Sequence, residues 1–358
     1  MRWAFIKGVL KDSHLSGIGV CSIFRTPLND NSNHLFMNHI EKINVLKSVI
    51  KKELAPLITN DYVLWGLPYH SNIGDTLIWE GELEFLKTLP YKCVGTCGWN
   101  EYEPKALSKD TVILIHGGGY FGDVWRLAWE YVLNTIEHYP DNRIILLPNT
   151  IFYNDVELMR SDAERMAKLK HLTICARDRK SYKIAKENFK SEVRLVPDMA
   201  FYISLNYLEK WSLPETETVL YLKRIDKELG AQDICIKAEH IDVRDWPTMD
   251  DEPSIGERVF YKGQALYYKT RIKYVRLHAF AEWLERMLAY HVYRKCLTRR
   301  GVEFVSQYKE IYTTRLHVMI LSVLLGKKAC FIDNNYGKLS SFYSTWLDDC
   351  DCVGRFDG

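Results

Sequence analysis

A short apolar segment, a polar loop and an amphipathic segment follow one another repeatedly along the chain, and this repetition limits the possible fold more than any other feature. The first unit has an apolar run at Tyr62–Leu67, a polar loop at 68–75 and helical periodicity over Thr76–Leu89. Short apolar runs are typical of strands buried on both faces of a parallel sheet. Further strands are predicted at Thr111–Ile115, Arg143–Pro148, Leu172–Ala176 and Val193–Val196. We therefore expect an α/β layer.

The periodicity breaks at 204–217, and Thr218–Lys223 opens a second block of the same kind. In this block strands are predicted at Val302–Val305, Ile311–Thr314 and Ala329–Asp333. The fold predicted is α/β, with two Rossmann-like domains that face a cleft in a GT-B-like arrangement. The predicted parts are an N-terminal extension with a helix (1–60), a first domain (61–205), a second domain (206–340) and a C-terminal tail (341–358). The acidic, irregular stretch 226–256 is interpreted as a long inserted loop.

Composition narrows the class of protein. At 358 residues the chain is long enough for two domains. Its net charge of +2 argues against a nucleic-acid partner. The nine Cys have no CxxC spacing, which argues against a zinc site and favours reduced thiols. No signal peptide and no apolar run of the roughly 18 residues needed to cross a bilayer is recognised, so a cytoplasmic location is predicted.

Polar residues follow the predicted strands at the edge where parallel sheets bind ligands. His70, Asn72 and Asp75 follow the first strand, and Arg177 and Asp198 follow two later ones. Each set has a structural alternative. Asn72 and Asp75 can cap the next helix, and Arg177 can form an ion pair with Asp198 or with its neighbour in sequence.

The loop after Thr111–Ile115 reads His-Gly-Gly-Gly-Tyr-Phe-Gly-Asp. Gly117, Gly118 and Gly119 allow the backbone to approach a ligand closely, or they form a tight turn against a neighbouring strand. The loop fits neither a P-loop nor GxGxxG, so no nucleotide cofactor is indicated. Asp123 closes it and is a further candidate for acid–base chemistry.

The corner at Arg315 and His317 joins a predicted strand to a predicted helix. A helix N-terminus attracts anions. An Arg forks onto carboxylate or phosphate, and a His titrates near neutrality. These two residues therefore suit anion binding combined with proton transfer. The alternative is a surface Arg beside a packed His.

A strongly basic helical pattern covers 264–300. It is interpreted either as a solvated helix face or, through 271–300, as a peripheral contact with anionic lipid at the inner membrane face. A second Arg-Leu-His triplet at 276–278 lies inside this pattern and is treated as a coincidence.

The ordered set of motifs resembles the polysaccharide pyruvyl transferase family. The resemblance covers about 60–347 and rests on six stretches. They are His70–Asp75, Gly117–Asp123, Ala176–Asp178 with Ser181, Pro197–Asp198, Thr314–His317 and Asp333–Lys338. At 148–150 this chain reads Pro-Asn-Thr, where the family usually has a glutamine-bearing motif.

The resemblance implies a GT-B enzyme that moves a pyruvyl group from phosphoenolpyruvate to a hexose of a surface polysaccharide or its lipid-linked precursor, with galactose as the expected hexose. It places the acceptor on the first domain and the donor on the second. Donor binding is then expected at Arg315, Arg177, His317 and Lys338, with His317 as the acid. Acceptor binding is expected at His70, Asn72, Gly117, Gly118, Gly119 and Asp198. Asp75, Asp123 or Asp198 is the base, and no metal or cofactor is expected.

Two other functions stay open at this point. One is a GT-B glycosyltransferase that uses a nucleotide sugar, although no clear nucleotide-reading segment is recognised. The other is a non-catalytic sugar-binding component of an envelope-synthesis complex, which would tolerate the loss of Arg315 or His317.

Overall fold

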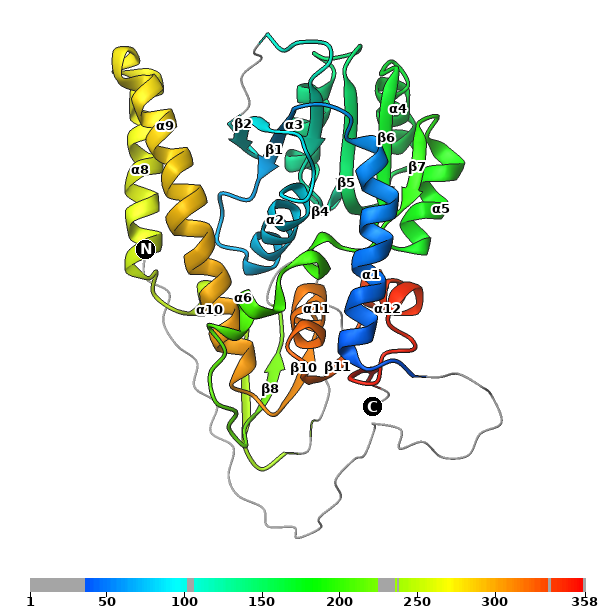
Figure 1. Cartoon of the computed structure of the whole chain (residues 1–358), viewed down its shortest axis with the longest axis vertical. Helices are drawn as coiled ribbons and strands as arrows, with labels where there is room; N and C mark the ends of the chain where they lie inside the picture. The colour runs from blue at the N-terminus through cyan, green and yellow to red at the C-terminus, as the bar shows by residue number, and fades with distance from the viewer. Residues whose placement is uncertain (1–35, 102–105, 225–235, 237, 334–335, 357–358) are drawn as a thin grey trace.

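Two parallel sheets form the scaffold (Figure 1). The computed structural model describes residues 36–101, 106–224, 236, 238–333 and 336–356. The first sheet contains β1 (Tyr62–Leu67), β2 (Cys93–Gly98), β3 (Val112–Ile115), β4 (Gly118–Gly122), β5 (Arg143–Phe152), β6 (His171–Ala176) and β7 (Glu192–Leu195). The second contains β8 (Val219–Leu222), β9 (Ile241–Arg244), β10 (Glu310–Thr313), β11 (Lys328–Phe331) and β12 (Val353–Arg355). The expected α/β class with two Rossmann-like layers is confirmed.

The strand orders are those of doubly wound sheets. The first sheet runs β2-β1-β3-β5-β6-β7, with β4 paired to β5, and the second runs β12-β11-β10-β8-β9. All of these pairs are parallel, so the loops that follow the strands gather at one edge of each sheet. This is where the predicted site residues lie.

Helices cover the sheets and join them. They are α1 (His39–Leu54), α2 (Ile73–Leu86), α3 (Arg126–Ile136), α4 (Val156–Met166), α5 (Arg179–Asn188), α6 (Leu205–Glu209), α7 (Pro247–Asp250), α8 (Ile255–Ile272), α9 (His278–Leu288), α10 (Arg294–Ser306), α11 (Leu316–Leu324) and α12 (Lys338–Trp346). Shorter turns are η1 (Ala55–Leu57), η2 (Met199–Tyr202), η3 (Val275–Leu277) and the π-helical η4 (Ala289–Tyr293). Among the described residues no helix is both long and apolar enough to cross a membrane.

Side chains at the strand ends also start the helices. The Asn72 side chain caps α2 by accepting from the Gly74 N–H, at 3.0 Å. Asp178 caps α5 in the same way by accepting from Ser181 N–H. The capping alternative considered for Asn72 is therefore confirmed. A cap of this kind fixes where the helix begins and therefore the direction of the side chains in its first turn.

Several local predictions are wrong. Val302–Val305 was predicted as a strand, but it lies inside α10, whose face from Gly301 to Val305 is buried against α2. The glycine-rich loop includes strand β4, which adds to β5. The tail beyond 341 supplies β12 to the second sheet. In the stretch 226–256 the structure describes β9 and α7, whereas 225–235 and 237 lie outside the described residues, as does the extension 1–35.

The two layers are joined by helices and buried polar contacts. Arg294 on α10 forms an ion pair with Glu80 on α2, both almost fully buried. A second contact between the layers is made by Trp346 on α12, whose Nε1 donates to the Arg177 carbonyl at 2.7 Å. Thr248 on α7 donates to the Ser71 carbonyl at 2.6 Å. These contacts hold the strand ends of the two sheets toward each other around one cavity.

The α8–α9 hairpin extends from the body along the side of the first sheet (Figure 1). Asn100, just after β2, donates to the Tyr268 hydroxyl on α8 at 3.1 Å. Glu285 on α9 faces Glu101, and burial and this neighbour raise the pKa of Glu285 to about 9. One of the two carboxyls therefore carries a proton at neutral pH, which allows the pair to stay buried.

Candidate active site

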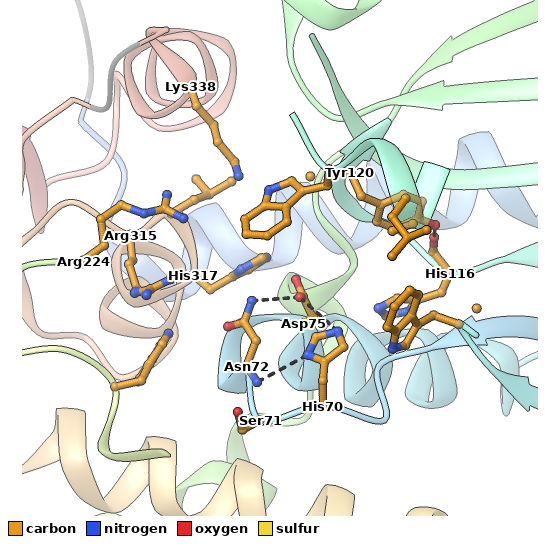
Figure 2. A pocket seen from close by; sticks show the side chains of 18 of the residues that line it. His70, Ser71, Asn72, Asp75, His116, Tyr120, Arg224, Arg315, His317 and Lys338 are labelled. Atoms are coloured by element: carbon orange, nitrogen blue, oxygen red, sulfur yellow. Dashed lines mark hydrogen bonds and ion pairs between the residues drawn. The ribbon is translucent and has the colours of Figure 1, made fainter. Parts of the chain in front are cut away.

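One cavity of about 560 Å³ lies where the two layers meet. Strand ends and helix starts from both sheets line it, and Figure 2 shows their side chains pointing toward a common centre. Its polar lining is His70, Ser71, Asn72, Asp75, His116, Arg126, Arg177, Arg224, Arg315, His317 and Lys338. Its aromatic and apolar lining includes Trp99, Tyr120, Trp125, Leu127, Val132, Trp246 and Met249. A volume of this size is typical of a small-molecule binding site.

Arg177 is fully buried and has one unused donor toward the cavity. Its Nε donates to Thr150 Oγ1 at 2.8 Å and its Nη1 to Asp198 Oδ2 at 2.7 Å. Its Nη2 has no hydrogen-bond partner in the part of the chain that the structure describes. A buried cationic N–H without an acceptor is costly, so it indicates a place for an anionic ligand oxygen.

Gly119 lets a second cation reach the same place. A Cβ at this position would lie 2.6 Å from Lys338 Nζ and 3.2 Å from Arg177 Nη2. The two nitrogens come from opposite layers and converge over the bare backbone of Gly119. The absence of a side chain there keeps open a small socket with two positive donors.

Arg315 stands on the second layer, directly after β10. Asp245 holds its guanidinium through Nε and Nη2, the latter at 2.6 Å. The backbone N–H of Arg315 donates to Thr313 Oγ1 at 2.9 Å, which shapes the corner before α11. Asp245 follows β9, so the stretch predicted as an inserted loop supplies the carboxylate that orients this arginine. Arg224, which follows β8, lines the cavity next to it.

His317 lies at the start of α11 and is held by Asp198. Its Nε2 lies 3.2 Å from Asp198 Oδ2, and the same carboxylate oxygen accepts from Arg177. Its ring packs on Gly74, where a Cβ would lie 2.5 Å from Nδ1. Burial would raise the pKa of Asp198, but His317 and Arg177 outweigh it and the pKa is strongly lowered. Asp198 is therefore a fixed negative charge that positions the side chains of both His317 and Arg177.

Asp75 is surrounded by imidazoles (Figure 2). Its Oδ2 accepts from Asn72 Nδ2 at 2.8 Å and lies 3.7 Å from His70 Nε2. Burial opposes ionisation of Asp75, but His70, His317, His116 and Lys338 together lower its pKa. The reverse holds for His70, whose pKa is lowered because burial outweighs the attraction of Asp75. At neutral pH this group is a carboxylate beside a neutral imidazole.

His116 was not among the predicted site residues, although it opens the glycine-rich motif. Its Nδ1 lies 2.8 Å from Glu82 Oε2, and Glu82 Oε1 accepts from the Gly117 N–H at 2.9 Å. Its Nε2 is buried and has no hydrogen-bond partner among the described residues. Burial disfavours the imidazolium, but Glu82 outweighs burial, and the pKa of His116 is raised. Its position directly after a buried strand was the available signal.

The structure places some predicted residues outside the cavity lining. Gly117 packs against β5, where a Cβ would lie 2.7 Å from the Pro148 carbonyl oxygen. Gly118 has φ 150° and belongs to β4. Asp123 accepts from the N–H groups of Asn154 and Asp155, the latter at 2.9 Å, and thus fixes the chain after β5. Asp198 is also absent from the cavity lining, and it contacts the lining residues Arg177 and His317.

Comparison with known proteins decides the family. The profile of polysaccharide pyruvyl transferases matches residues 72–336, which span both sheets. The chain belongs to this enzyme family. The matched span contains Asn72, Asp75, Arg177, Arg315 and His317, and it stops just short of His70 at one end and Lys338 at the other.

Related pyruvyl transferases cover most of the chain. EpsO of Bacillus subtilis, named as a candidate pyruvyl transferase, is 26% identical over 323 residues, covering 88% of this chain and 93% of EpsO. Pyruvyl transferase 1 of Schizosaccharomyces pombe is 26% identical over 314 residues, covering 81% of this chain and 71% of that protein. A crystal structure of an uncharacterised Klebsiella pneumoniae protein matches with a TM-score of 0.55 and 19% identity, covering 89% of this chain and 98% of that one. It supports the fold of this family member.

The Pro-Asn-Thr segment of this pyruvyl transferase, at 148–150, contacts the buried side chain of Arg177. Thr150 accepts from the Arg177 Nε, whereas Asn149 is buried and donates to the Leu147 carbonyl at 2.7 Å. Neither side chain lines the cavity. In this chain the segment therefore orients the buried arginine.

Proposed function

We propose that this family member transfers the pyruvyl group of phosphoenolpyruvate to two hydroxyls of a hexose in a polysaccharide or in its lipid-linked precursor, with release of phosphate and formation of a cyclic ketal. The observation that carries the proposal is a single cavity with two kinds of wall. Converging cations at Arg177, Lys338 and Arg315 form one wall, and an ionised carboxylate among histidines, centred on Asp75, forms the other.

The cations suit the donor. Phosphoenolpyruvate carries a phosphate and a carboxylate on one carbon, so it needs several positive donors at short range. The socket at Gly119, with Arg177 Nη2 and Lys338 Nζ, accepts one of these anionic groups. Arg315, held by Asp245 at the start of α11, faces the other. The family membership favours this donor over the nucleotide sugar considered from the sequence.

His317 supplies the acid. A proton from its ring adds to the methylene carbon of phosphoenolpyruvate, which becomes a methyl group and leaves positive charge on the central carbon. Asp198 orients the ring, because its ionised carboxylate lies 3.2 Å from Nε2. The adjacent anionic groups of the donor reduce the cost of the cationic centre.

Asp75 supplies the base. The first sugar hydroxyl forms a bond to the central carbon and gives its proton to Asp75. The second hydroxyl then forms the other carbon–oxygen bond while the bond to phosphate breaks, and its proton leaves with the phosphate. Asp75 then gives its proton up to solvent and His317 takes one from solvent, so that over one turnover a hydroxyl proton replaces the proton that His317 gave to the methyl group. His116 lines the cavity, and its buried Nε2, which has no hydrogen-bond partner in the described parts of the chain, orients the acceptor beside Asp75.

The acceptor fits the aromatic part of the wall. Trp99, Trp125 and Tyr120 line the cavity on the side of the first sheet. Aromatic faces pack against the apolar C–H surface of a sugar ring, and the polar groups nearby bind its hydroxyls. A hexose that presents two neighbouring or 4,6-related hydroxyls provides both bonds of the ketal.

The direct test is to incubate the enzyme with phosphoenolpyruvate and a panel of β-galactosides. We expect release of phosphate in equal amount to a sugar product whose mass has increased by one pyruvyl unit. Thermal shift with phosphoenolpyruvate and with UDP-sugars is the companion measurement. Stabilisation by a UDP-sugar alone would contradict the proposal.

Gly119→Ala is expected to weaken donor binding. The added methyl group would lie 2.6 Å from Lys338 Nζ and 3.2 Å from Arg177 Nη2, and the buried arginine has little room to move. We expect KM for phosphoenolpyruvate to rise roughly tenfold or more, with a smaller change in kcat. Gly354→Ala is the matched control, because a Cβ there meets no described atom within 4 Å. If both variants had the same KM for phosphoenolpyruvate, the proposal that the donor binds at the Gly119 socket would be contradicted.

Glu82→Gln is expected to change the pH dependence. In the native enzyme His116 loses its Nε2 proton as pH rises through its raised pKa, because Glu82 keeps the proton on Nδ1. The new amide must keep its oxygen on the Gly117 N–H, so its NH₂ donates to Nδ1 and Nε2 retains a proton. The alkaline decline of kcat/KM caused by His116 should disappear. Glu84→Gln on the same helix is the control, and an unchanged decline in both variants contradicts this role.

A further inference from the structure

The end of the α8–α9 hairpin exposes more apolar surface than a solvated loop needs. We define the hairpin tip as residues 271–283. Its exposed apolar side chains are Ile272, Tyr274, Val275, Leu277, Phe280 and Trp283, and Ile272 and Val275 are 79% and 72% exposed. Phe280 and Trp283 lie side by side, with ring centroids 5.9 Å apart. A contiguous exposed apolar patch of this kind marks a surface that another body covers.

The same tip is positively charged. Arg271, Lys273 and Arg276 are all exposed and alternate with the apolar side chains. The sequence has no acidic residue between Glu257 and Glu282. Glu282 forms an ion pair with Arg286 on its own helix. The partner of the tip must therefore offer negative charge and an apolar interior at the same place.

The remainder of the basic stretch 271–300 does not offer such a surface. Arg294 is buried against Glu80, and Arg300 forms an ion pair with the buried Glu257. Arg299 pairs with Glu303 one turn further along α10 at 2.6 Å. Arg294 thus binds α10 to α2, Arg300 binds α10 to α8, and Arg299 is paired within α10. The cationic surface predicted over the whole stretch 271–300 therefore narrows to its first residues.

We propose that the hairpin tip inserts into the headgroup region of an anionic lipid bilayer and holds the enzyme at the membrane surface. All residues from Arg271 to Leu277 are exposed, so the tip is apolar around its end and not along one face. A groove on a partner protein binds a helix along one apolar face. A fluid bilayer can instead surround the end of a hairpin that has apolar side chains on all sides. Tyr and Trp side chains prefer the lipid–water boundary, and Lys and Arg bind the phosphates above it.

The α8–α9 hairpin also contacts the segment after β2 that lines the cavity. Tyr268, about one helical turn before Ile272, accepts the hydrogen bond from Asn100, and the adjacent Trp99 lines the cavity. The buried pair Glu101 and Glu285 lies in the same contact. The wall assigned to the acceptor is thus fixed to the element that meets the lipid. Membrane binding by the tip does not depend on the proposed reaction.

Flotation of the full chain with vesicles tests the proposal. We expect binding to vesicles of phosphatidylglycerol and phosphatidylcholine, weak binding to phosphatidylcholine alone, and release at high salt. Lys273→Glu with Arg276→Glu should lower the partition coefficient roughly 30-fold or more. Ile272→Ser with Val275→Ser should lower it without changing its salt dependence. Lys168→Glu with Lys190→Glu, on exposed positions near α4 and α5, is the charge-matched control.

Activity on a water-soluble galactoside should be equal in the native enzyme and in both tip variants, so loss of lipid binding is separable from loss of catalysis. Three results would overturn the proposal. They are no flotation with anionic vesicles, equal flotation of the tip variants and the control, and a concentration-dependent dimer that the Ile272→Ser/Val275→Ser variant abolishes, which would assign the tip to a second copy of the chain.

Discussion

His317→Gln should lower the rate of pyruvyl transfer by roughly 10²–10⁴-fold, the usual contribution of a positioned general acid. A glutamine amide can still donate to Asp198, which otherwise accepts from Arg177 and the Ala200 N–H. It cannot release a proton to the methylene carbon. We therefore expect kcat to fall while stabilisation of the protein by phosphoenolpyruvate is kept. Phosphate release and thermal shift measure the two quantities separately.

The chain offers a matched control for this variant. Arg276-Leu277-His278 repeats the triplet at Arg315 to His317, but His278 lies at the hairpin and its Nδ1 is 3.3 Å from Thr270 Oγ1. His278→Gln should leave transfer to a water-soluble acceptor unchanged. His317 is 8% exposed, so a structural role must also be measured. If His317→Gln unfolds several degrees below the native enzyme and has lost the response to phosphoenolpyruvate, His317 is a packing residue and the acid lies elsewhere.

The sequence pattern predicted the strands that carry the site, because each is an apolar run followed at once by polar residues. β1 has the predicted bounds, and β6, β8 and β10 differ only at their ends. The pattern failed where burial came from another element. In α10, Gly301 packs on Ile73 and the apolar residues Val302, Phe304 and Val305 are buried, so the run 302–305 resembles a short buried strand in its composition. β2 and β12 lie at the sheet edges and have weaker apolar patterns.

The site itself was predicted in part. Proximity to a strand end placed Asp75, Arg177 and Arg315 in the cavity, but it cannot separate a residue that faces the ligand from one that holds a neighbour. Asp198 and Asp123 are of the second kind, since Asp198 Oδ2 accepts from Arg177 and lies beside His317, and Asp123 Oδ2 accepts from two backbone N–H groups. The dyad of His116 and Glu82 joins two strand units that are 34 residues apart, and no spacing in the sequence announces it.

Asp75→Asn should lower kcat by roughly 10²–10⁴-fold as well, by removal of the base. The amide has almost the same shape, and its oxygen can still accept from Asn72. The pKa of Asp75 is already below its ordinary value, so the native carboxylate is ionised throughout the neutral range. The acid limb of the native profile therefore belongs to another group, and the defect of the variant should be nearly constant from pH 6 to pH 8, as measured by phosphate release.

Asp123→Asn is the sharpest control, because the sequence alone made Asp75 and Asp123 equal candidates. Asp123 lies outside the cavity lining and accepts from the N–H groups of Asn154 and Asp155, so its replacement should affect stability and leave kcat within a few-fold. A large loss of kcat in Asp123→Asn with little loss in Asp75→Asn would reverse the assignment. Comparable losses in folded forms of both variants would mean that the chain after β5 also reaches the acceptor, and the base could no longer be assigned to the carboxylate among the histidines.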